Sequence, residues 1–141
     1  MRYLGLDLGS KTLGVAISDK TGFIASSYKT IHHDEDYDGL IKEVEELVQK
    51  LEIGAVVLGF PKNMDNTIGY KGELSLQFQK KLEEVLSIPI YLQDERLTTK
   101  IATDMLIQGN VSRKNRKKVV DSVAATVILQ SYLDRSDKSE K

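Results

Sequence analysis

The sequence predicts a mixed α/β fold, a five-stranded sheet with helices on its faces. Three observations point to this class: alternating apolar residues near the N-terminus, one uninterrupted apolar run in the middle of the chain, and helical periodicity on both sides of that run. With 141 residues, of which 40% are apolar, the chain has the size of one compact domain. We expect this domain to span residues 1–134 and a polar, flexible tail to follow over residues 135–141.

The first three strands are expected to form an antiparallel meander. Residues 2–8 alternate, with leucines on one face and Tyr3, Gly5 and Asp7 on the other. Residues 13–18 alternate in the same way. The segment Asp19–Gly22 then has the composition of a hairpin turn, and it leads into a third strand near Phe23–Ile31.

The rest of the chain alternates between helices and strands. A helix capped by Asp38 carries apolar residues at helical spacing up to Leu51. The run Ala55–Phe60 is apolar throughout, as in a strand that is buried on both faces in a parallel part of a sheet. The later elements are a loop over 61–69, a helix marked by Leu74, Phe78, Leu82 and Val85, a strand over 88–93, a short helix from Thr98 to Gly109, and a last helix over about 116–133. The sheet would thus combine three antiparallel meander strands with two parallel strands.

Acidic or polar residues follow three strands that should end at the same edge of the sheet. Asp7 closes the first strand, residues 61–65 follow the central one, and Asp94 and Glu95 follow the fifth. Ligands of open α/β sheets tend to bind outside the carboxyl ends of parallel strands. A single acid at a strand end is often a solvated loop residue, but three such ends together favour a functional site.

Asp121 is expected on the inward side of the last helix. The polar stripe of that helix consists of Lys118, Ser122, Thr126 and Gln130, whereas Asp121 shares a ridge with Ala125, Ile128 and Tyr132. A carboxylate on the inward side is costly unless it is paired or binds a cation, so the alternatives are a salt bridge, for example to Arg96, and a metal site. Small residues on the Asp7 face, namely Gly5, Gly14 and Ala16, would let this helix approach closely and bring Asp121 near Asp7.

A cluster of carboxylates suits magnesium or a similar divalent cation, because such ions prefer oxygen ligands and keep waters and substrate phosphates in their shell. Two such ions can activate a water and stabilise the leaving oxygen of a phosphodiester. A basic run that could bind phosphates precedes Asp121, and it consists of Arg113, Lys114, Arg116, Lys117 and Lys118. Cations in the first turn of a helix oppose its dipole, so phosphate binding explains this run better than a solvated helix start does.

The composition argues against several other classes of protein. The 20 basic and 21 acidic residues nearly balance, so net charge alone does not indicate a nucleic-acid binder. No cysteine is present, hence no disulfide, zinc–thiolate site or thiol nucleophile. No apolar run reaches the roughly 18 residues of a membrane span, and no secretory signal is visible, so we expect a cytoplasmic protein. His32 and His33 lie in an acidic segment and are expected on the surface.

Five segments, taken in order, carry a family resemblance. They are Gly5–Lys11, Gly14–Asp19, Gly59–Asp65, Asp94–Thr99 and Asp121–Ala125. Together they resemble the YqgF/RuvX family, whose members are described as pre-16S rRNA nucleases and Holliday-junction-resolvase-like proteins. The string Asp-Glu-Arg-Leu-Thr-Thr, combined with the first and last segments, is highly specific, and the resemblance covers nearly the whole chain. It implies an RNase H-like fold, dependence on Mg²⁺ or Mn²⁺, and a bacterial cytoplasmic role in maturing the 5′ end of small-subunit ribosomal RNA.

The resemblance assigns three acids as catalytic residues and metal ligands. Asp7 matches the acid of the family's first strand, Glu95 that of its Asp-Glu-Arg motif, and Asp121 that of its last helix. Asp94 could substitute for Glu95 or assist it. Neighbours in a strand point to opposite faces, so only one of the two can enter the site, and we favour Glu95.

The resemblance also indicates residues that contact the substrate. Lys11, Asn63 and Arg96 match positions that would bind phosphate or brace the site. The chain departs from the usual pattern at Thr12, where an arginine is common, and at Asn66, where a glycine is common. The first departure weakens the case for a loop that grips the substrate backbone with two cations. Neither departure removes a proposed metal ligand.

Other functions stay open at this point. The chain could be a resolvase of Holliday junctions or other structured DNA, or a nucleic-acid-binding or ribosome-assembly factor that keeps the fold but catalyses little. Asp7-Leu-Gly-Ser also resembles the phosphate loop of the actin and sugar-kinase superfamily, but one 141-residue copy lacks the second domain that closes over ATP. We expect a nucleic acid as partner, precursor ribosomal RNA or branched DNA, and no membrane. The sequence fits a monomer and a homodimer equally.

Overall fold

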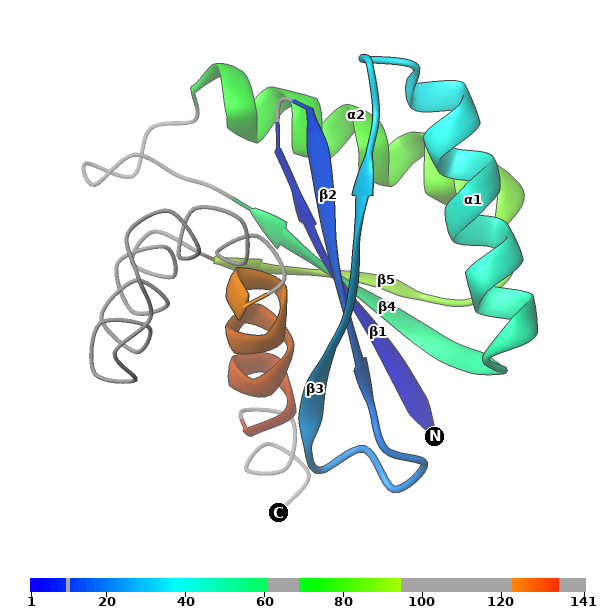
Figure 1. The fold of residues 1–141 in the computed structure, drawn as a ribbon, viewed down its shortest axis with the longest axis vertical. Helices are drawn as coiled ribbons and strands as arrows, with labels where there is room; N and C mark the ends of the chain where they lie inside the picture. The colour runs from blue at the N-terminus through cyan, green and yellow to red at the C-terminus, as the bar shows by residue number, and fades with distance from the viewer. Residues whose placement is uncertain (10, 61–68, 95–122, 135–141) are drawn as a thin grey trace.

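A five-stranded mixed sheet forms the centre of the fold (Figure 1). The structure is a computed structural model that describes residues 1–9, 11–60, 69–94 and 123–134. In spatial order the strands are β3 (Ala25–His32), β2 (Thr12–Ser18), β1 (Arg2–Leu8), β4 (Ile53–Phe60) and β5 (Ile90–Asp94). Strand β2 pairs antiparallel with β1 and β3, whereas β4 pairs parallel with β1 and β5. The predicted meander and the two further parallel strands are therefore confirmed.

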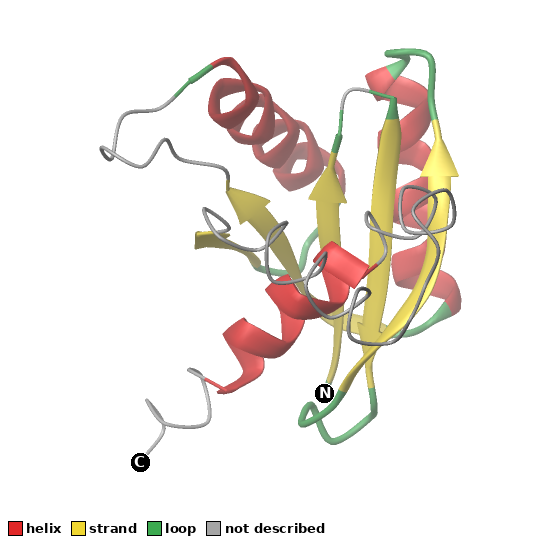
Figure 2. Cartoon of the chain, turned by 60° about the vertical axis from the view of Figure 1, so that its left-hand side comes forward, coloured by secondary structure: helices red, strands yellow, loops and turns green. Residues whose placement is uncertain are grey.

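Helices cover both faces of the sheet (Figure 2). Helices α1 (Tyr37–Lys50) and α2 (Tyr70–Val85) lie on one face, and the helix over residues 123–134, called the C-terminal helix below, lies on the other. Each face has its own apolar core. Because the side chains of a strand alternate between the faces, each of the strands β1 to β4 contributes to both cores.

The central strands show why the apolar pattern specifies this arrangement. Leu4 and Leu6 of β1 are fully buried on the side of α1 and α2, as are Val56 and Leu58 of β4. Val57 of β4 is fully buried on the opposite side, against the C-terminal helix. The uninterrupted apolar run of β4 is thus that of a strand covered on both faces, as predicted.

Helix α1 is amphipathic in the predicted manner. Its apolar face is buried and consists of Leu40, Ile41, Val44, Leu47 and Val48. The predicted N-cap, Asp38, is wrong by two residues: Asp36 caps the helix, and its carboxylate accepts a hydrogen bond of 3.1 Å from the Gly39 backbone N–H. Both aspartates precede the apolar periodicity, and the sequence pattern does not separate them.

The start of one strand also differs from the prediction. Strand β3 begins at Ala25 and not near Phe23, because the Asp19 carboxylate accepts hydrogen bonds from the backbone N–H groups of Phe23 and Ile24 and holds both residues in the turn. Gly22 has a φ of 76° there, which an L-residue rarely adopts. Helix α2 ends at Val85 as predicted, although Val85 is 46% exposed and does not join the core that Phe78 and Leu82 enter.

Candidate functional site

Strands β1, β4 and β5 end at the same edge of the sheet (Figure 1). Leu6 pairs with Leu58 in the parallel ladder of β1 and β4, and Phe60 pairs with Asp94 in that of β4 and β5. Adjacent strands are about 4.8 Å apart. The predicted convergence of the carboxyl ends of these three strands is therefore confirmed at the level of the backbone.

Asp7 lies at this edge, on the face covered by the C-terminal helix. Its neighbours Leu6 and Leu8 are buried in the core beneath α1 and α2, so alternation points the Asp7 side chain to the opposite face. Asp7 is half-buried and pairs with Gly14 of β2 in the antiparallel ladder. A half-buried carboxylate on this edge remains accessible to a ligand.

Side-chain contacts define the two faces of β5. Tyr91 faces the C-terminal helix, where its ring stacks on that of Tyr132 with the centroids 5.2 Å apart. Ile90 and Leu92 pack against the other core. Gln93 therefore shares the face of Tyr91, and it is buried. Asp94 ends the strand, and its side chain lies outside the described part of the structure.

The C-terminal helix packs directly on β1. A Cβ atom added to Gly5 would lie 2.7 Å from the Cβ of Leu129 and 3.1 Å from the carbonyl oxygen of Ala125. Ala16 is fully buried in the same contact region. The prediction that small residues on the Asp7 face allow close approach of this helix is confirmed for Gly5 and Ala16.

The direction of the C-terminal helix follows from three contacts. Tyr132 lies near Tyr3 at the start of β1, with the ring centroids 6.0 Å apart. Leu129 and Ala125 contact Gly5 farther along β1. The C-terminal end of the helix therefore lies near the start of β1, and its N-terminal end points toward Asp7.

Gln130, on the predicted polar stripe of the C-terminal helix, has hydrogen-bond partners in the β2–β3 hairpin. Its side-chain amide donates a 2.9 Å hydrogen bond to the carbonyl oxygen of Phe23, and its side-chain oxygen accepts one of 2.9 Å from the Ala25 backbone N–H. The spacing places Gln130 on a polar stripe but does not indicate these two partners. Helical periodicity indicates only that Gln130 is not on the apolar face of the helix. It does not indicate that the β2–β3 hairpin lies beside that position.

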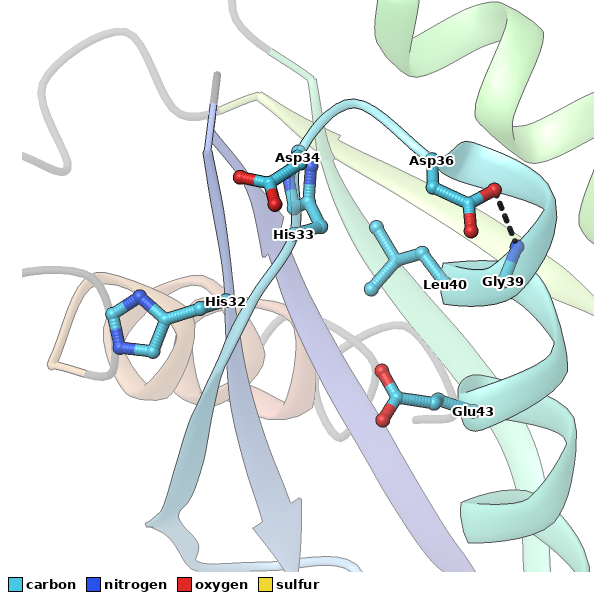
Figure 3. A pocket seen from close by; sticks show the side chains of 7 residues that line it. All are labelled: His32, His33, Asp34, Asp36, Gly39, Leu40 and Glu43. Carbon is cyan, nitrogen blue, oxygen red and sulfur yellow. Dashed lines mark hydrogen bonds between the residues drawn. The ribbon is translucent and has the colours of Figure 1, made fainter.

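The loop between β1 and β2 carries Lys11, whose side chain is exposed. His33 lies behind this loop and is buried, with 9% of its surface exposed, so the expectation of a surface residue is wrong for His33 and right for the exposed His32. The reason is the alternation of β3, which turns the two neighbours to opposite sides of the sheet (Figure 3). No charged or apolar pattern in the sequence separates them.

An open pocket of about 480 Å³ lies between the end of β3 and α1 (Figure 3). Its lining is mostly polar and acidic, and consists of His32, His33, Asp34, Asp36, Gly39, Leu40 and Glu43. Tyr37 lies beside His33, and partial burial, with the nearby negative charge of Glu35, raises the pKa of its phenol above the usual value. This pocket lies on the face opposite to the Asp7 side chain.

Many of the predicted site residues lie outside the described residues. They are Asn63, Glu95, Arg96, Arg113, Lys114, Arg116, Lys117, Lys118 and Asp121. The same holds for the short helix predicted from Thr98 to Gly109. Within the described ranges, no group of three or more His, Asp or Glu side chains could hold a metal ion. No helix in these ranges is long and apolar enough to cross a membrane.

Known proteins resemble the chain over nearly its whole length. The profile of the family described as "RuvX: Holliday junction resolvase" matches residues 1–135. Proteins of Geobacillus sp. (strain WCH70) and Bacillus subtilis (strain 168), both named "Putative pre-16S rRNA nuclease", are each 52% identical over 135 residues, which covers 95% of this chain and 98% of theirs.

Solved structures of low sequence identity share the fold. RuvC of T. thermophilus in complex with a Holliday junction substrate is similar with a TM-score of 0.60 at 16% identity, over 97% of this chain and 96% of that one. A second structure of Thermus thermophilus RuvC gives a TM-score of 0.57. The expected RNase H-like fold is thereby confirmed.

Proposed function

The chain belongs to the RuvX family, and from this premise we propose that it is a nuclease that hydrolyses phosphodiester bonds with the help of Mg²⁺ or Mn²⁺. Its proposed substrate is precursor 16S ribosomal RNA, which it would process in the maturation of the 5′ end. In a bacterium this role places the protein in the cytoplasm. The observation that carries the proposal is the position of Asp7. It lies at the edge of the sheet where β5 ends and toward which the N-terminal end of the C-terminal helix points.

The packing of the C-terminal helix supports Asp121 as a partner of Asp7. Ala125 contacts Gly5, and Asp7 lies two residues farther along β1, about 6.6 Å away. Asp121 precedes Ala125 by four residues, which is about 6 Å along a helix axis and returns to the same helix face. If the helix extends by one more turn, as proposed, it carries Asp121 toward Asp7.

The alternation of β5 supports Glu95 over Asp94 as the third acid. Tyr91 and Gln93 share the face of Asp7. We propose that the strand alternation continues through the next two residues, so that Glu95 and not Asp94 would share that face. Asp94 would then support the site from behind and would not bind the same ion.

The proposed donor set fits a hard divalent cation. All three acids supply carboxylate oxygens, which Mg²⁺ and Mn²⁺ prefer, and the chain has no cysteine to favour a softer metal. When bound, the ions supply Lewis-acid stabilisation of the phosphate and a water of lowered pKa. Asp7, Glu95 and Asp121 would hold these ions by their carboxylates, and no side chain need become covalently attached to the substrate.

Basic residues and the neutral Asn63 around this edge would hold the nucleic acid. Lys11 is exposed on the β1–β2 loop, next to the strand end that carries Asp7. Asn63 and Arg96 follow β4 and β5 in sequence, and Arg96 could alternatively pair with a carboxylate. The basic run from Arg113 to Lys118 immediately precedes Asp121 in the chain. Contacts from these cations to phosphates would orient the backbone and carry no sequence information.

The decisive experiment compares the wild-type protein with Asp7→Asn on three substrates: a precursor 16S ribosomal RNA, a four-way DNA junction and an unstructured single-stranded RNA. Each is incubated with Mg²⁺, with Mn²⁺ and with EDTA. We expect divalent-dependent cleavage of the precursor RNA by the wild type and none by Asp7→Asn, because asparagine keeps the size of the side chain but loses the charge that holds the ion. If the wild type cleaves the four-way junction in preference to the RNA, the chain would instead have the Holliday junction resolvase activity that the family's description names.

The matched control is Glu46→Gln, which neutralises an exposed carboxylate on α1, on the other face of the sheet. It should cleave like the wild type. Binding of all substrates by the wild type without any cleavage, in either metal, would favour an assembly factor over a nuclease. Full activity of Asp7→Asn would overturn the assignment of the site.

A further inference from the structure

His33 is a buried histidine that the proposed chemistry does not use. It follows β3 directly, where the chain turns from the sheet toward α1 (Figure 3). Its ring lies 5.4 Å from that of Tyr37, measured between centroids, at an interplanar angle of 49°. This packing explains a flat ring at the position but does not require an imidazole. The hydrogen bonds of its two nitrogens do.

The hydrogen bonds of His33 fix the tautomer of its ring. The backbone N–H of Glu35 donates to Nδ1 over 3.2 Å, so Nδ1 carries no proton. In the neutral ring the proton is then on Nε2, which donates to the carbonyl oxygen of Gly9 over 3.2 Å. Glu35 has a φ of 65°, in the left-handed region that glycine favours, and this backbone conformation accompanies its bond to Nδ1. Both sides of the ring are therefore engaged.

His33 holds both ends of the loop between β1 and β2. Besides the bond from Nε2 to Gly9, its backbone N–H donates to the carbonyl oxygen of Lys11 over 2.9 Å. The Gly9 N–H donates to the carbonyl oxygen of Thr12 over 2.8 Å and closes the loop. Only Leu8, which is anchored in the core, separates Gly9 from Asp7.

We propose that His33 is a positioning residue for the candidate site: through the Gly9 carbonyl it fixes the loop after β1 and thereby the Asp7 carboxylate. The inference rests on the proposed role of Asp7 as a metal ligand. His33 lies on the α1 side of the sheet and the Asp7 side chain on the other. The histidine therefore acts from behind the site and does not contact the substrate.

Two substitutions separate the two hydrogen bonds of the ring. In His33→Gln the side-chain amide nitrogen can take the place of Nε2 and still donate to Gly9. In His33→Asn the side-chain oxygen can take the place of Nδ1 and still accept from Glu35, but the shorter side chain cannot reach Gly9. The same two changes at the exposed neighbour His32 are the matched controls.

The first readout does not depend on catalysis. Amide hydrogen exchange at Gly9 should accelerate by about tenfold in His33→Asn, because the loop opens more often once its support is lost. Exchange at Gly9 should stay near wild type in His33→Gln and in both His32 variants. Accelerated exchange in both His33 variants, or in neither, would overturn the proposal.

The second readout is the cleavage of precursor RNA. A displaced metal ligand slows the chemical step, and small displacements at a reacting centre can cost up to about a hundredfold. We expect kcat of His33→Asn to fall by about ten- to a hundredfold with KM for the RNA near wild type, and His33→Gln to restore most of kcat. Equal losses in the two variants would indicate a merely structural role and overturn the proposal.

Failure of the proposed function has a different signature. In that case the wild type itself would neither cleave nor bind Mn²⁺ in a titration, whereas the exchange at Gly9 still decides whether His33 holds the loop. If the wild type binds Mn²⁺, weaker binding by His33→Asn than by His33→Gln supports positioning of Asp7. Identical Mn²⁺ affinity of wild type and His33→Asn would separate the loop from the metal site and overturn the proposal.

Discussion

Gly5 of β1 lies directly beneath Leu129 of the C-terminal helix, so closely that a Cβ atom at Gly5 would lie 2.7 Å from the Cβ of Leu129. The nearest obstacle is thus the root of a side chain and not its flexible end. The backbone carbonyl of Ala125 lies at 3.1 Å from the same point. The absence of a side chain at Gly5 therefore sets the distance between the helix and the sheet.

Substituting Gly5 by valine should displace the C-terminal helix from β1. Overpacking of a buried contact costs about 1–3 kcal/mol of the free energy of unfolding, which urea denaturation would measure. The control is Ser26→Val on the exposed surface of β3, which should change stability by less than about 0.5 kcal/mol. Equal stability of Gly5→Val and wild type would contradict the close contact.

Replacing Gln130 by methionine should loosen the helix from the β2–β3 hairpin. Methionine keeps the length of the side chain but loses the hydrogen bonds to Phe23 and Ala25, and the partly buried Ala25 N–H is left without this acceptor. The expected loss is about 1–3 kcal/mol of the free energy of unfolding, together with faster amide exchange at Ala25. Gln49→Met, at an exposed position of α1, is the control and should be nearly neutral. Unchanged exchange at Ala25 in Gln130→Met would contradict the tether.

The Asp19 turn should make hairpin stability depend on pH on the acid side. The hydrogen bond from the Thr21 hydroxyl, together with those from the Ile24 and Phe23 N–H groups, holds the pKa of Asp19 well below its usual 3.8. The folded pKa is the lower one, so the stabilisation is complete above the unfolded pKa and is lost as pH falls through the folded pKa.

Asp19→Asn removes this ionisation and tests the sign. The stability difference between wild type and Asp19→Asn, from urea denaturation, should be constant above about pH 5 and shrink as pH falls below about 4. Thr21→Val should reduce the stability gained from the ionised Asp19 by less than Asp19→Asn does. It removes one hydrogen-bond donor to the carboxylate and leaves the two backbone donors. A difference that grows on acidification would contradict the assigned pKa shift.

The basic run should contribute to nucleic-acid affinity without regard to sequence. Neutralising Lys117 and Lys118 to glutamine should weaken binding about equally for all tested sequences and reduce the salt slope by about one unit per lost phosphate contact. Binding titrations at several salt concentrations measure both. The control pair, Lys42→Gln and Lys50→Gln, lies on α1, on the face of the sheet opposite to the Asp7 side chain, and should leave the slope unchanged. An unaltered slope in the Lys117 and Lys118 variant would assign both lysines to the solvated surface.

Local patterns predicted the sheet and the place of the first site residue. Alternation in residues 2–8 separates the core leucines from Asp7, and the apolar run of β4 indicates a strand covered on both faces. The small side chains at Gly5 and Ala16 correctly indicated a close helix contact on the Asp7 face. The assignment of Glu95 and Asp121 came from the family resemblance and from helix and strand periodicity, and it stays a prediction.

Several features depended on partners far away in the chain. Gln130 has the periodicity of a solvent-facing residue, yet it binds Ala25, 105 positions earlier, because the hairpin passes beside the helix. His32 and His33 are chemically identical neighbours, and only the end of β3 and the loop at Gly9 make one of them buried and hydrogen-bonded.

The amino-acid order by itself determined which segments become strands and helices, which face of each is apolar, and that Asp7 ends the first strand. The spacing of apolar residues determines these features, because it differs between strands and helices and shows which residues share a face. Only the tertiary structure decided in which direction the C-terminal helix runs along β1 and that His33 supports the loop behind Asp7. Such contacts join residues that are far apart in the chain, and no periodic pattern in the sequence links them. They form only when the sheet has assembled.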